Sequence, residues 1–222
     1  MNSNFVVKID HIVNEKLIIE PHYLPTIRYV SYLYHATYFI LDDESLFQKQ
    51  SYRNRTYISG ANAPLCLIVP VKKGKSKQAF KEVQIDNSTN WQHIHWTSFF
   101  SAYNNSPFFE HYRSIFEPYY FKKHTFLLDL NLMLLHELVK ALNLETQLLL
   151  LSESEKSNDY IDFRNNIHPK EKYNLIDSRY IEQEYIQVFS DRFGFQKGLS
   201  VLDLLFSEGP NANHFLQSNF SF

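Results

Sequence analysis

Glycine is scarce in this chain, with five among 222 residues, whereas average usage would give about 16. The G-x-G-x-x-G fingerprint, the Walker A pattern and the G-x-S-x-G nucleophile elbow each need glycines at fixed short spacings. None of these patterns can be written with Gly60, Gly74, Gly194, Gly198 and Gly209. The common backbone loops that cradle phosphate are therefore excluded, and side chains would have to hold any phosphate-bearing ligand.

Cysteine and long apolar runs are also lacking. The single cysteine, Cys66, lies in the apolar stretch 65–69, which excludes a disulfide framework and a cysteine-rich metal site. No stretch approaches the ~20 apolar residues of a membrane span, and Met1–Glu20 has no apolar run typical of a signal peptide. No histidine or carboxylate spacing indicates a metal site. We expect a reduced, cytoplasmic protein with no membrane insertion, no metal and no other cofactor.

Aromatic residues, in contrast, are abundant, with 19 Phe, 15 Tyr and 2 Trp. A hydrophobic fraction of 44% supplies a substantial core, and the lack of linker-like stretches favours one domain over residues 1–222. Lys16–Glu20 and Tyr38–Leu41 have the pattern of short buried strands. Between them, Pro25 suits the first turn of a helix that runs to about His35. This order predicts a parallel βαβ unit with a right-handed crossover.

The rest of the chain continues to alternate strands with helices. Arg55–Ser59 and Leu65–Val71 predict an antiparallel hairpin. Ser200 and Asp203 form a capping box for a helix that Gly209 ends. The other expected elements are strands at Glu82–Ile85, Thr146–Leu151 and Tyr185–Phe189, helices from Asn87 or Ser88 to Tyr103, from Pro107, over Phe126–Leu142 and from Pro210, and an irregular, mobile segment at Ser154–Asn174. The pattern predicts an α/β fold: a mixed sheet with an N-terminal βαβ unit, antiparallel hairpin additions and flanking helices.

Positive charge is concentrated between Gln48 and Lys81, where eight basic residues occur without any acidic one. Arg53 and Arg55 lie two apart and would share one face of a strand. Arginine forks bind phosphate oxygens in pairs and lysines bind them as point charges, so these arginines with Lys72 and Lys73 suit a phosphate or diphosphate. The alternatives are a surface hairpin for the arginines and a solvated loop for the lysines. Nucleic acid is not expected, because the whole chain carries a net charge of −2 and the aromatics outside this stretch follow helical spacing.

Three further candidates follow the predicted parallel strands. His22 follows the first, and Asp42 and Asp43 follow the second. Ligands of such sheets bind at the carboxyl edge, so we expect His22 to contact ligand and one aspartate to act as a base or to pair with Arg53. Their structural alternatives are loop capping for His22 and strand termination for the aspartates. His93 and His95, on a helix rich in aromatics, are better explained by packing, although one of them could face a cleft.

Several segments together resemble the WbqC-like family. The resemblance covers residues 17 to 217 and depends on the order and spacing of the following stretches: Glu20–Pro25 with Tyr29, Ile40–Asp43, Gln48-Lys49, Arg53-Asn54-Arg55, Val69–Gly74, Tyr103, Pro107–Phe109, Gly198–Phe206 and Glu208–Pro210. The family usually opens with Gln-Pro and has glycine before the tyrosine, where this chain has Glu20 and Arg28. The resemblance implies a bacterial protein encoded among enzymes of O-antigen and other surface polysaccharides. Some members are described as probable transferases that decorate an amino sugar, for example by aminoacyl transfer. It implies no established catalytic residues, but the positions Asp42, Asp43, Arg53, Asn54, Arg55 and Lys72 recur in it.

Three functions remain open. The first is a group-transfer enzyme that acts on a sugar nucleotide or another phosphate-linked small molecule. In it, Arg53, Arg55 and Lys72 would hold phosphate, and His22 or Asp42 would take the proton from the attacking amine or hydroxyl. The second is a nucleotidyltransferase- or ligase-like enzyme with the same fold. The third is a non-catalytic binding or scaffold protein of polysaccharide assembly, whose aromatic residues would serve a partner interface.

Overall fold

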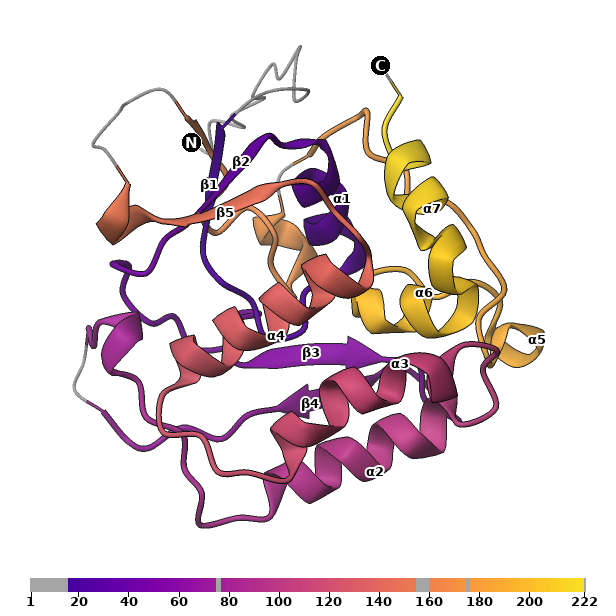
Figure 1. Cartoon of the computed structure of the whole chain (residues 1–222), viewed down its shortest axis with the longest axis horizontal. Coiled ribbons are helices and arrows are strands. Elements are labelled where there is room, and N and C mark those ends of the chain that lie inside the picture. The colour runs from indigo at the N-terminus through magenta and orange to yellow at the C-terminus, as the bar shows by residue number, and fades with distance from the viewer. Residues whose placement is uncertain (1–15, 75–76, 155–159, 175, 222) are drawn as a thin grey trace.

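The protein has an α/β fold built around a four-stranded parallel sheet (Figure 1). We describe a computed structural model over residues 16–74, 77–154, 160–174 and 176–221. The strands are β1 (Lys16–Ile19), β2 (Tyr38–Leu41), β5 (Gln147–Leu150) and β6 (Ile161–Asp162), in the order β5-β2-β1-β6. Every neighbouring pair is parallel. Residues 1–15, which make up most of Met1–Glu20, lie outside the described residues. Lys75 of the basic stretch also lies outside them.

The predicted βαβ unit is confirmed. β1 and β2 pair in register from Lys16 with Tyr38 to Ile19 with Leu41, and α1 (Ile27–His35) joins them. The helix begins two residues later than expected, because Thr26 is its N-cap and its hydroxyl accepts the Tyr29 N–H at 3.3 Å. Thus the loop after β1 and the start of α1 lie at the carboxyl edge of the sheet.

The predicted hairpin is also present but forms a sheet of its own. β3 (Arg55–Ile58) pairs antiparallel with β4 (Leu65–Ile68). Figure 1 shows this pair apart from the four-stranded sheet, with α4 (Leu127–Ala141) crossing the molecule between them in that view. Asn131 on α4 ties the two parts together, since its amide donates to the carbonyls of Pro21 after β1 and Arg53 before β3.

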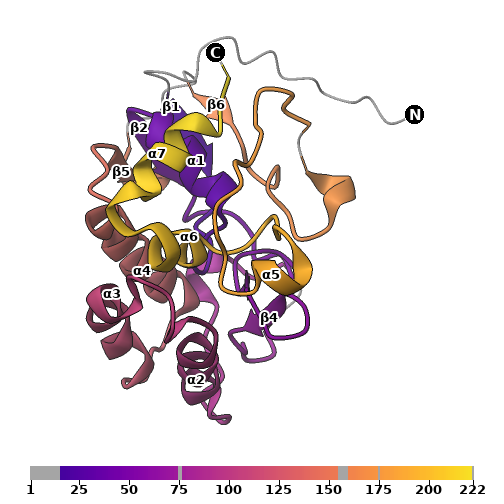
Figure 2. The same ribbon diagram turned by 90° about the vertical axis from the view of Figure 1, so that its right-hand side faces the viewer.

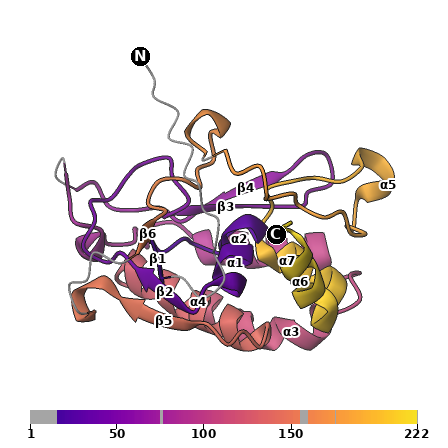
Figure 3. The same ribbon diagram turned by 90° about the horizontal axis from the view of Figure 1, so that it is seen from above.

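Helices enclose the remaining surfaces. α6 (Val201–Glu208) and α7 (Ala212–Ser218) pack against α1, and α3 (Phe109–Phe116) packs against α4 and α6 (Figures 2 and 3). The others are α2 (Trp91–Tyr103), the short α5 (Ser190–Phe193) and the 3-10 turns η1 (Phe80–Glu82), η2 (Glu117–Tyr120), η3 (Leu151–Glu153), η4 (Glu171–Tyr173) and η5 (Gly209–Asn211). In the described parts of the chain, no helix combines the length and hydropathy needed to cross a bilayer.

Two predicted strands are absent. In Glu82–Ile85, the Gln84 carbonyl accepts the Lys72 N–H, whereas the Ile85 N–H donates to the Thr125 carbonyl. The segment therefore forms one isolated bridge to each of two neighbours and no continuous strand ladder. Tyr185–Phe189 is irregular, and it bonds its neighbours through side chains rather than through a backbone ladder. The Tyr185 hydroxyl donates to Asp203, and the Gln187 side chain bonds both backbone groups of Gln196.

Three other boundaries or roles differ from expectation. α2 begins at Trp91 and not after Asn87, because the Asn87 amide group bonds the His124 carbonyl and the Trp91 indole. The capping box is half formed: the Ser200 hydroxyl accepts from Leu202, but the Ser200 N–H donates to Tyr57 and the Asp203 carboxylate binds Tyr185. The segment expected to be irregular contains β6, while its part 155–159 lies outside the described residues.

Candidate functional site

The carboxyl ends of β1 and β6 form the most suitable ligand-binding edge of the sheet. From β1 the chain moves outward to β2 and β5, and then returns to the opposite side of β1 as β6. A parallel sheet opens a crevice where its connections diverge in this way. Here the crevice lies between Glu20–His22, which follow β1, and Phe163–Asn165, which follow β6.

A buried charge cluster occupies this edge. The Glu20 carboxylate lies 3.3 Å from Nη1 of Arg53 and 3.5 Å from Nε2 of His22. Its other oxygen accepts the Asn165 N–H at 2.9 Å. Glu20 and His22 are each 1% exposed and Arg53 is 2% exposed. The Glu20 carboxylate therefore links the loop after β1 to the loop after β6.

Burial and partners set the charges in this cluster. Burial alone would raise the pKa of Glu20, but its neighbours His22 and Arg53 and the Asn165 N–H lower it to about 2. Burial lowers the pKa of His22, and the Arg53 charge lowers it further against the opposing effect of Glu20. Glu20 is then a carboxylate at neutral pH, beside a neutral imidazole and a guanidinium that stays protonated.

Two exposed amide side chains separate Arg53 from solvent. Its Nη1 donates to Gln48 Oε1 at 3.4 Å, and its Nη2 donates to Asn165 Oδ1 at 3.2 Å. Gln48 and Asn165 are themselves exposed. The fork of Arg53 thus points outward at acceptors that can be displaced, while Glu20 holds it from within.

The His22 ring is enclosed by tyrosines. Its centroid lies 4.6 Å from that of Tyr29 and 5.4 Å from that of Tyr52. Among the described residues, neither ring nitrogen has a hydrogen-bond partner, since the contact with Glu20 at 3.5 Å is too long to count as one. A buried imidazole without partners is costly, and Tyr52, which contacts this ring, also lines a nearby cavity.

The predicted aspartates lie at the same edge but are engaged. Asp42 pairs with Arg164 at 3.2 Å and accepts from the N–H groups of residues 44 and 45. Asp43 accepts from both the N–H and the hydroxyl of Ser152, at 3.0 and 2.6 Å. Asp42 therefore shares the edge with the charge cluster, whereas Asp43 anchors the segment after β5.

The other predicted residues are spread more widely. The Asn54 amide donates to the Val69 carbonyl at 3.0 Å and ties β3 to β4. Arg55 lies beside Tyr57, two residues further along the same face of β3. Lys72 is exposed and donates to Gln84, and Lys73 is exposed. Within the described part of the chain, no hydrogen bond or ion pair joins either lysine to Arg53.

A cavity of about 410 Å³ opens beside the cluster. Tyr52 lines it, as do Ile167 and His168 from the chain after β6 and Thr26 and Arg28 from the start of α1. The charges of Glu20 and Arg53 both act on the pKa of His168, so the cluster lies within electrostatic range of this wall. The remaining lining residues are Tyr57, Pro64, Pro169, Asn174, Tyr180, Glu182, Lys197, Gly198 and Leu199.

Charge in this cavity is mixed but mainly positive. The guanidinium of Arg28 lies 5.2 Å from the centre of the Tyr180 ring. Glu182 is the one carboxylate in the described wall, and it accepts from Tyr180 and from the Gly198 N–H. Burial raises the pKa of Glu182, although these bonds and the charges of Lys197 and Arg28 oppose the rise. His168 Nδ1 accepts the Lys170 N–H at 3.0 Å, so a neutral ring carries its proton on Nε2 and can donate it.

The histidines of α2 serve packing. His95 is buried, with Nδ1 2.8 Å from the Tyr23 hydroxyl and Nε2 3.2 Å from the Ile68 carbonyl. Because a carbonyl only accepts, Nε2 carries the proton and Nδ1 accepts from Tyr23. His93 is exposed. Among the described residues, no group of three or more histidine, cysteine, aspartate or glutamate side chains could hold a metal ion.

Sequence patterns alone did not single out Glu20, Asn165 or the cavity residues Arg28 and Lys197. β6 has two residues, too few for any periodicity, so the polar residues after it gave no signal of a strand end. Glu20 could have been found from its place at the end of an apolar strand, where an unpaired carboxylate is costly and a buried cation is needed.

A family model described as the WbqC-like protein family matches residues 20–179. A curated protein, the uncharacterized protein Rv1507c of Mycobacterium tuberculosis strain ATCC 25618 / H37Rv, is 25% identical over 223 residues. That alignment covers 90% of this chain and 96% of the mycobacterial protein. No solved structure matches.

Proposed function

The chain belongs to the WbqC-like protein family, and from this premise we propose that it is a group-transfer enzyme acting on a phosphate-bearing sugar substrate. The acceptor would be the amine or hydroxyl of an amino sugar or sugar nucleotide, and the transferred group an acyl or aminoacyl group. The pathway would be the synthesis of a bacterial surface polysaccharide, as the sequence resemblance implies.

One observation carries the proposal. The cavity with Arg28 and Lys197 in its wall lies at the diverging edge of a parallel sheet, directly beside the Glu20–His22 pair. Cations at the start of a helix whose first turn contains no acidic residue suit a phosphate group. The pKa values of Glu20 and His22 are both lowered, and buried titratable groups with perturbed pKa values are more frequent at functional sites than elsewhere.

In this proposal, phosphate oxygens bind Arg28 and Lys197, and His168 donates its Nε2–H to the same ligand. Glu182 accepts from a sugar hydroxyl, because its carboxylate is the acceptor in a wall otherwise rich in donors. Arg53 contributes when ligand oxygens replace the amide oxygens of Gln48 and Asn165. The arginine thereby takes the phosphate-binding role expected of it from the sequence.

His22 is the proposed proton acceptor. The acceptor nitrogen forms a bond to the acyl carbon, the bond from that carbon to its leaving group breaks, and the nitrogen's proton passes to the neutral imidazole. The Glu20 carboxylate then stabilises the imidazolium, as a carboxylate does in a catalytic triad. His22 returns the proton to the leaving group. Access requires the Tyr52 side chain to turn away from the ring it covers.

A non-catalytic binding protein is the second candidate, and the enclosure of His22 favours it. In that case the cavity binds the same phosphate-bearing ligand, but the Glu20–His22–Arg53 cluster only supports the fold. A nucleotidyltransferase- or ligase-like enzyme would use the same cavity for a nucleoside triphosphate and would release pyrophosphate.

Thermal unfolding with a panel of uridine diphosphate sugars, nucleoside triphosphates and acyl thioesters tests the proposal. A ligand at 100 times its Kd adds about 2.7 kcal/mol, which raises Tm by roughly 5–10 °C in a chain of this size. Lys197→Met should abolish the shift, while Lys123→Met, an exposed lysine away from this cavity, should retain it. Absence of a shift with every phosphate-bearing compound contradicts the proposal. Product formation that His22→Asn removes without loss of binding separates an enzyme from a binding protein.

A further inference from the structure

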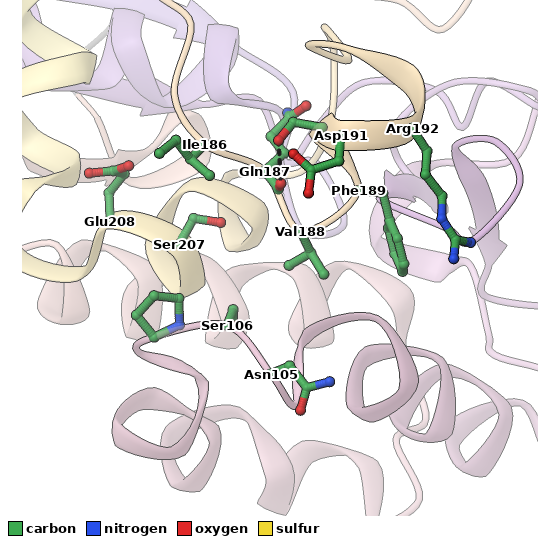
Figure 4. A pocket seen from close by; sticks show the side chains of 12 residues that line it. Asn105, Ser106, Ile186, Gln187, Val188, Phe189, Asp191, Arg192, Ser207 and Glu208 are labelled. Carbon is green, nitrogen blue, oxygen red and sulfur yellow. Dashed lines mark hydrogen bonds between the residues drawn. The ribbon is translucent and has the colours of Figure 1, made fainter.

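A second and larger cavity has a volume of about 650 Å³ (Figure 4). Its walls are the turn at 105–107 before α3, the segment 186–192 and the last residues of α6. None of its lining residues belongs to the first cavity. Its volume is within the range of small-molecule sites.

An unpartnered hydroxyl points into this cavity. Ser207 is 8% exposed, and its Oγ has no hydrogen-bond partner among the described residues. Figure 4 shows this oxygen directed toward the space between the Ile186 and Val188 side chains. A buried hydroxyl is usually paired, so an unpaired oxygen in a cavity wall suits a polar ligand.

The groups around Ser207 favour a ligand with hydroxyls and without negative charge. The Asp191 carboxylate points toward the same space, whereas the Arg192 guanidinium extends away from it (Figure 4). Asn105 supplies an exposed amide on the opposite wall. A carboxylate, an amide and a free hydroxyl together offer donors and acceptors for several hydroxyl groups, while the carboxylate opposes phosphate.

Apolar surface complements these polar groups. Phe189 and Val188 line the cavity, and Ile186 at its edge is 82% exposed. The C–H faces of a pyranose ring pack on such side chains, while its hydroxyls reach the polar groups. An isoleucine this exposed gains from any ligand that covers it.

The wall is held in place before any ligand binds. Gln187 donates to the Gln196 carbonyl and accepts its N–H, at 2.9 and 2.7 Å. Ser190 bonds the Gln187 carbonyl at 2.9 Å, and Ser106 on the opposite wall bonds the Tyr103 carbonyl at 2.7 Å. These side chains are engaged in holding the backbone, whereas Ser207 and Asp191 have no such role and are available to a ligand.

We propose that this cavity is a saccharide-binding site that holds an uncharged pyranose through Ser207 and Asp191, with Phe189 and Val188 against the ring. The site is independent of the phosphate-binding cavity and of the proposed transfer reaction. The shared chemistry is that of a free sugar or of one unit in a glycan. Comparing a methyl glycoside with the corresponding trisaccharide distinguishes the two sources, since a glycan site binds the trisaccharide more tightly.

Saturation-transfer NMR with the methyl glycosides of glucose and N-acetylglucosamine tests this site on the full chain. Ser207→Ala should weaken binding about fivefold, the value of one hydrogen bond, without lowering Tm, because the hydroxyl has no partner to lose. Ser101→Ala, at an exposed serine on α2, is the matched control and should bind like the wild type. Asp191→Asn should also weaken binding, and Lys197→Met should not.

Three results would overturn the assignment. The first is the absence of saturation transfer to both glycosides. The second is equal glycoside binding by Ser207→Ala and the wild type, and the third is displacement of the glycoside by inorganic phosphate. Loss of binding in Lys197→Met with none in Ser207→Ala would move the sugar to the first cavity and also overturn it.

Discussion

Replacing Arg53 with methionine isolates the role of the buried guanidinium. Methionine keeps an unbranched apolar stem but loses the guanidinium, whose carbon lies 6.0 Å from the centre of the Phe80 ring. The change removes the positive charge 3.3 Å from the Glu20 carboxylate. It therefore leaves a carboxylate that is 1% exposed beside a neutral imidazole.

The expected cost is large. Removing one partner of a buried ion pair destabilises a protein by about 3–5 kcal/mol, because the remaining charge is desolvated without compensation. The drop of the Glu20 pKa from 4.5 to about 2 corresponds to about 3 kcal/mol of stabilisation at neutral pH, to which His22, Arg53 and the Asn165 N–H all contribute. We expect Arg53→Met to lose about 3–5 kcal/mol of unfolding free energy.

The pH dependence gives the sign. In the wild type the Glu20 pKa is lowered, so its contribution is present above about pH 4.5 and is lost as pH falls toward about 2. Without Arg53, less opposes the effect of burial, so the Glu20 pKa of the variant is higher than that of the wild type and Glu20 takes up its proton at a higher pH. The deficit of the variant relative to the wild type should therefore shrink as pH falls through the Glu20 pKa of the variant.

Urea unfolding followed by tryptophan fluorescence measures these free energies. Glu20→Gln should rescue the Arg53→Met background by at least about 2 kcal/mol in a double-mutant cycle. Arg113→Met, which breaks an exposed pair with Glu110 at 3.0 Å, should cost about 0–1 kcal/mol. A cost for Arg53→Met as small as that of the control, independent of pH and unrescued by Glu20→Gln, would refute the reasoning.

Three further predictions concern stability. Gly209→Ala places a Cβ 2.5 Å from the Phe108 ring at φ +55°, and it should cost more than about 2 kcal/mol of unfolding free energy in urea. Gly194→Ala, at φ +66° with no described atom within 4 Å of the new Cβ, should cost only about 1 kcal/mol. Equal costs for the two variants would contradict the contact with Phe108. Burial lowers the pKa of His95 to about 4. The unfolding free energy of the wild type should therefore fall by up to about 3 kcal/mol between about pH 6.5 and 4, because the unfolded state takes up a proton there. His95→Gln should show a correspondingly flatter pH profile of urea midpoints. Asp43→Ala and Ser152→Ala should be non-additive by about 1–2 kcal/mol, and strict additivity would mean that their bonds add nothing.

The fold was predictable where local and long-range signals agree. Lys16–Glu20 and Tyr38–Leu41 have apolar runs bounded by charge or proline, and both appear as parallel strands. Glu82–Ile85 has similar composition but meets two different neighbours singly, which no local pattern reveals. The strand predicted at Tyr185–Phe189 does not form, and the side chains of this segment instead bond the backbone of Gln196 and the carboxylate of Asp203.

The candidate site was predictable in part for the same reason. His22 and Asp42 follow strands of a parallel sheet, so their shared edge follows from the βαβ pattern. The local excess of positive charge pointed to Arg53. Its contacts with Glu20, Gln48 and Asn165 could not be predicted, because they join residues as many as 112 positions apart in sequence. The cavity residue Lys197 is contributed by a segment that comes well after the last strand of the sheet in sequence, and no spacing rule connects it to Arg28.

A crystal structure of the protein with a uridine diphosphate sugar tests the central claim most directly. The account predicts that the diphosphate lies within hydrogen-bond distance of Arg28 and Lys197, with the sugar directed toward Tyr52 and the Glu20–His22 pair behind it. A diphosphate bound instead at the exposed lysines 72 and 73, or in the cavity beside Ser207, would contradict it.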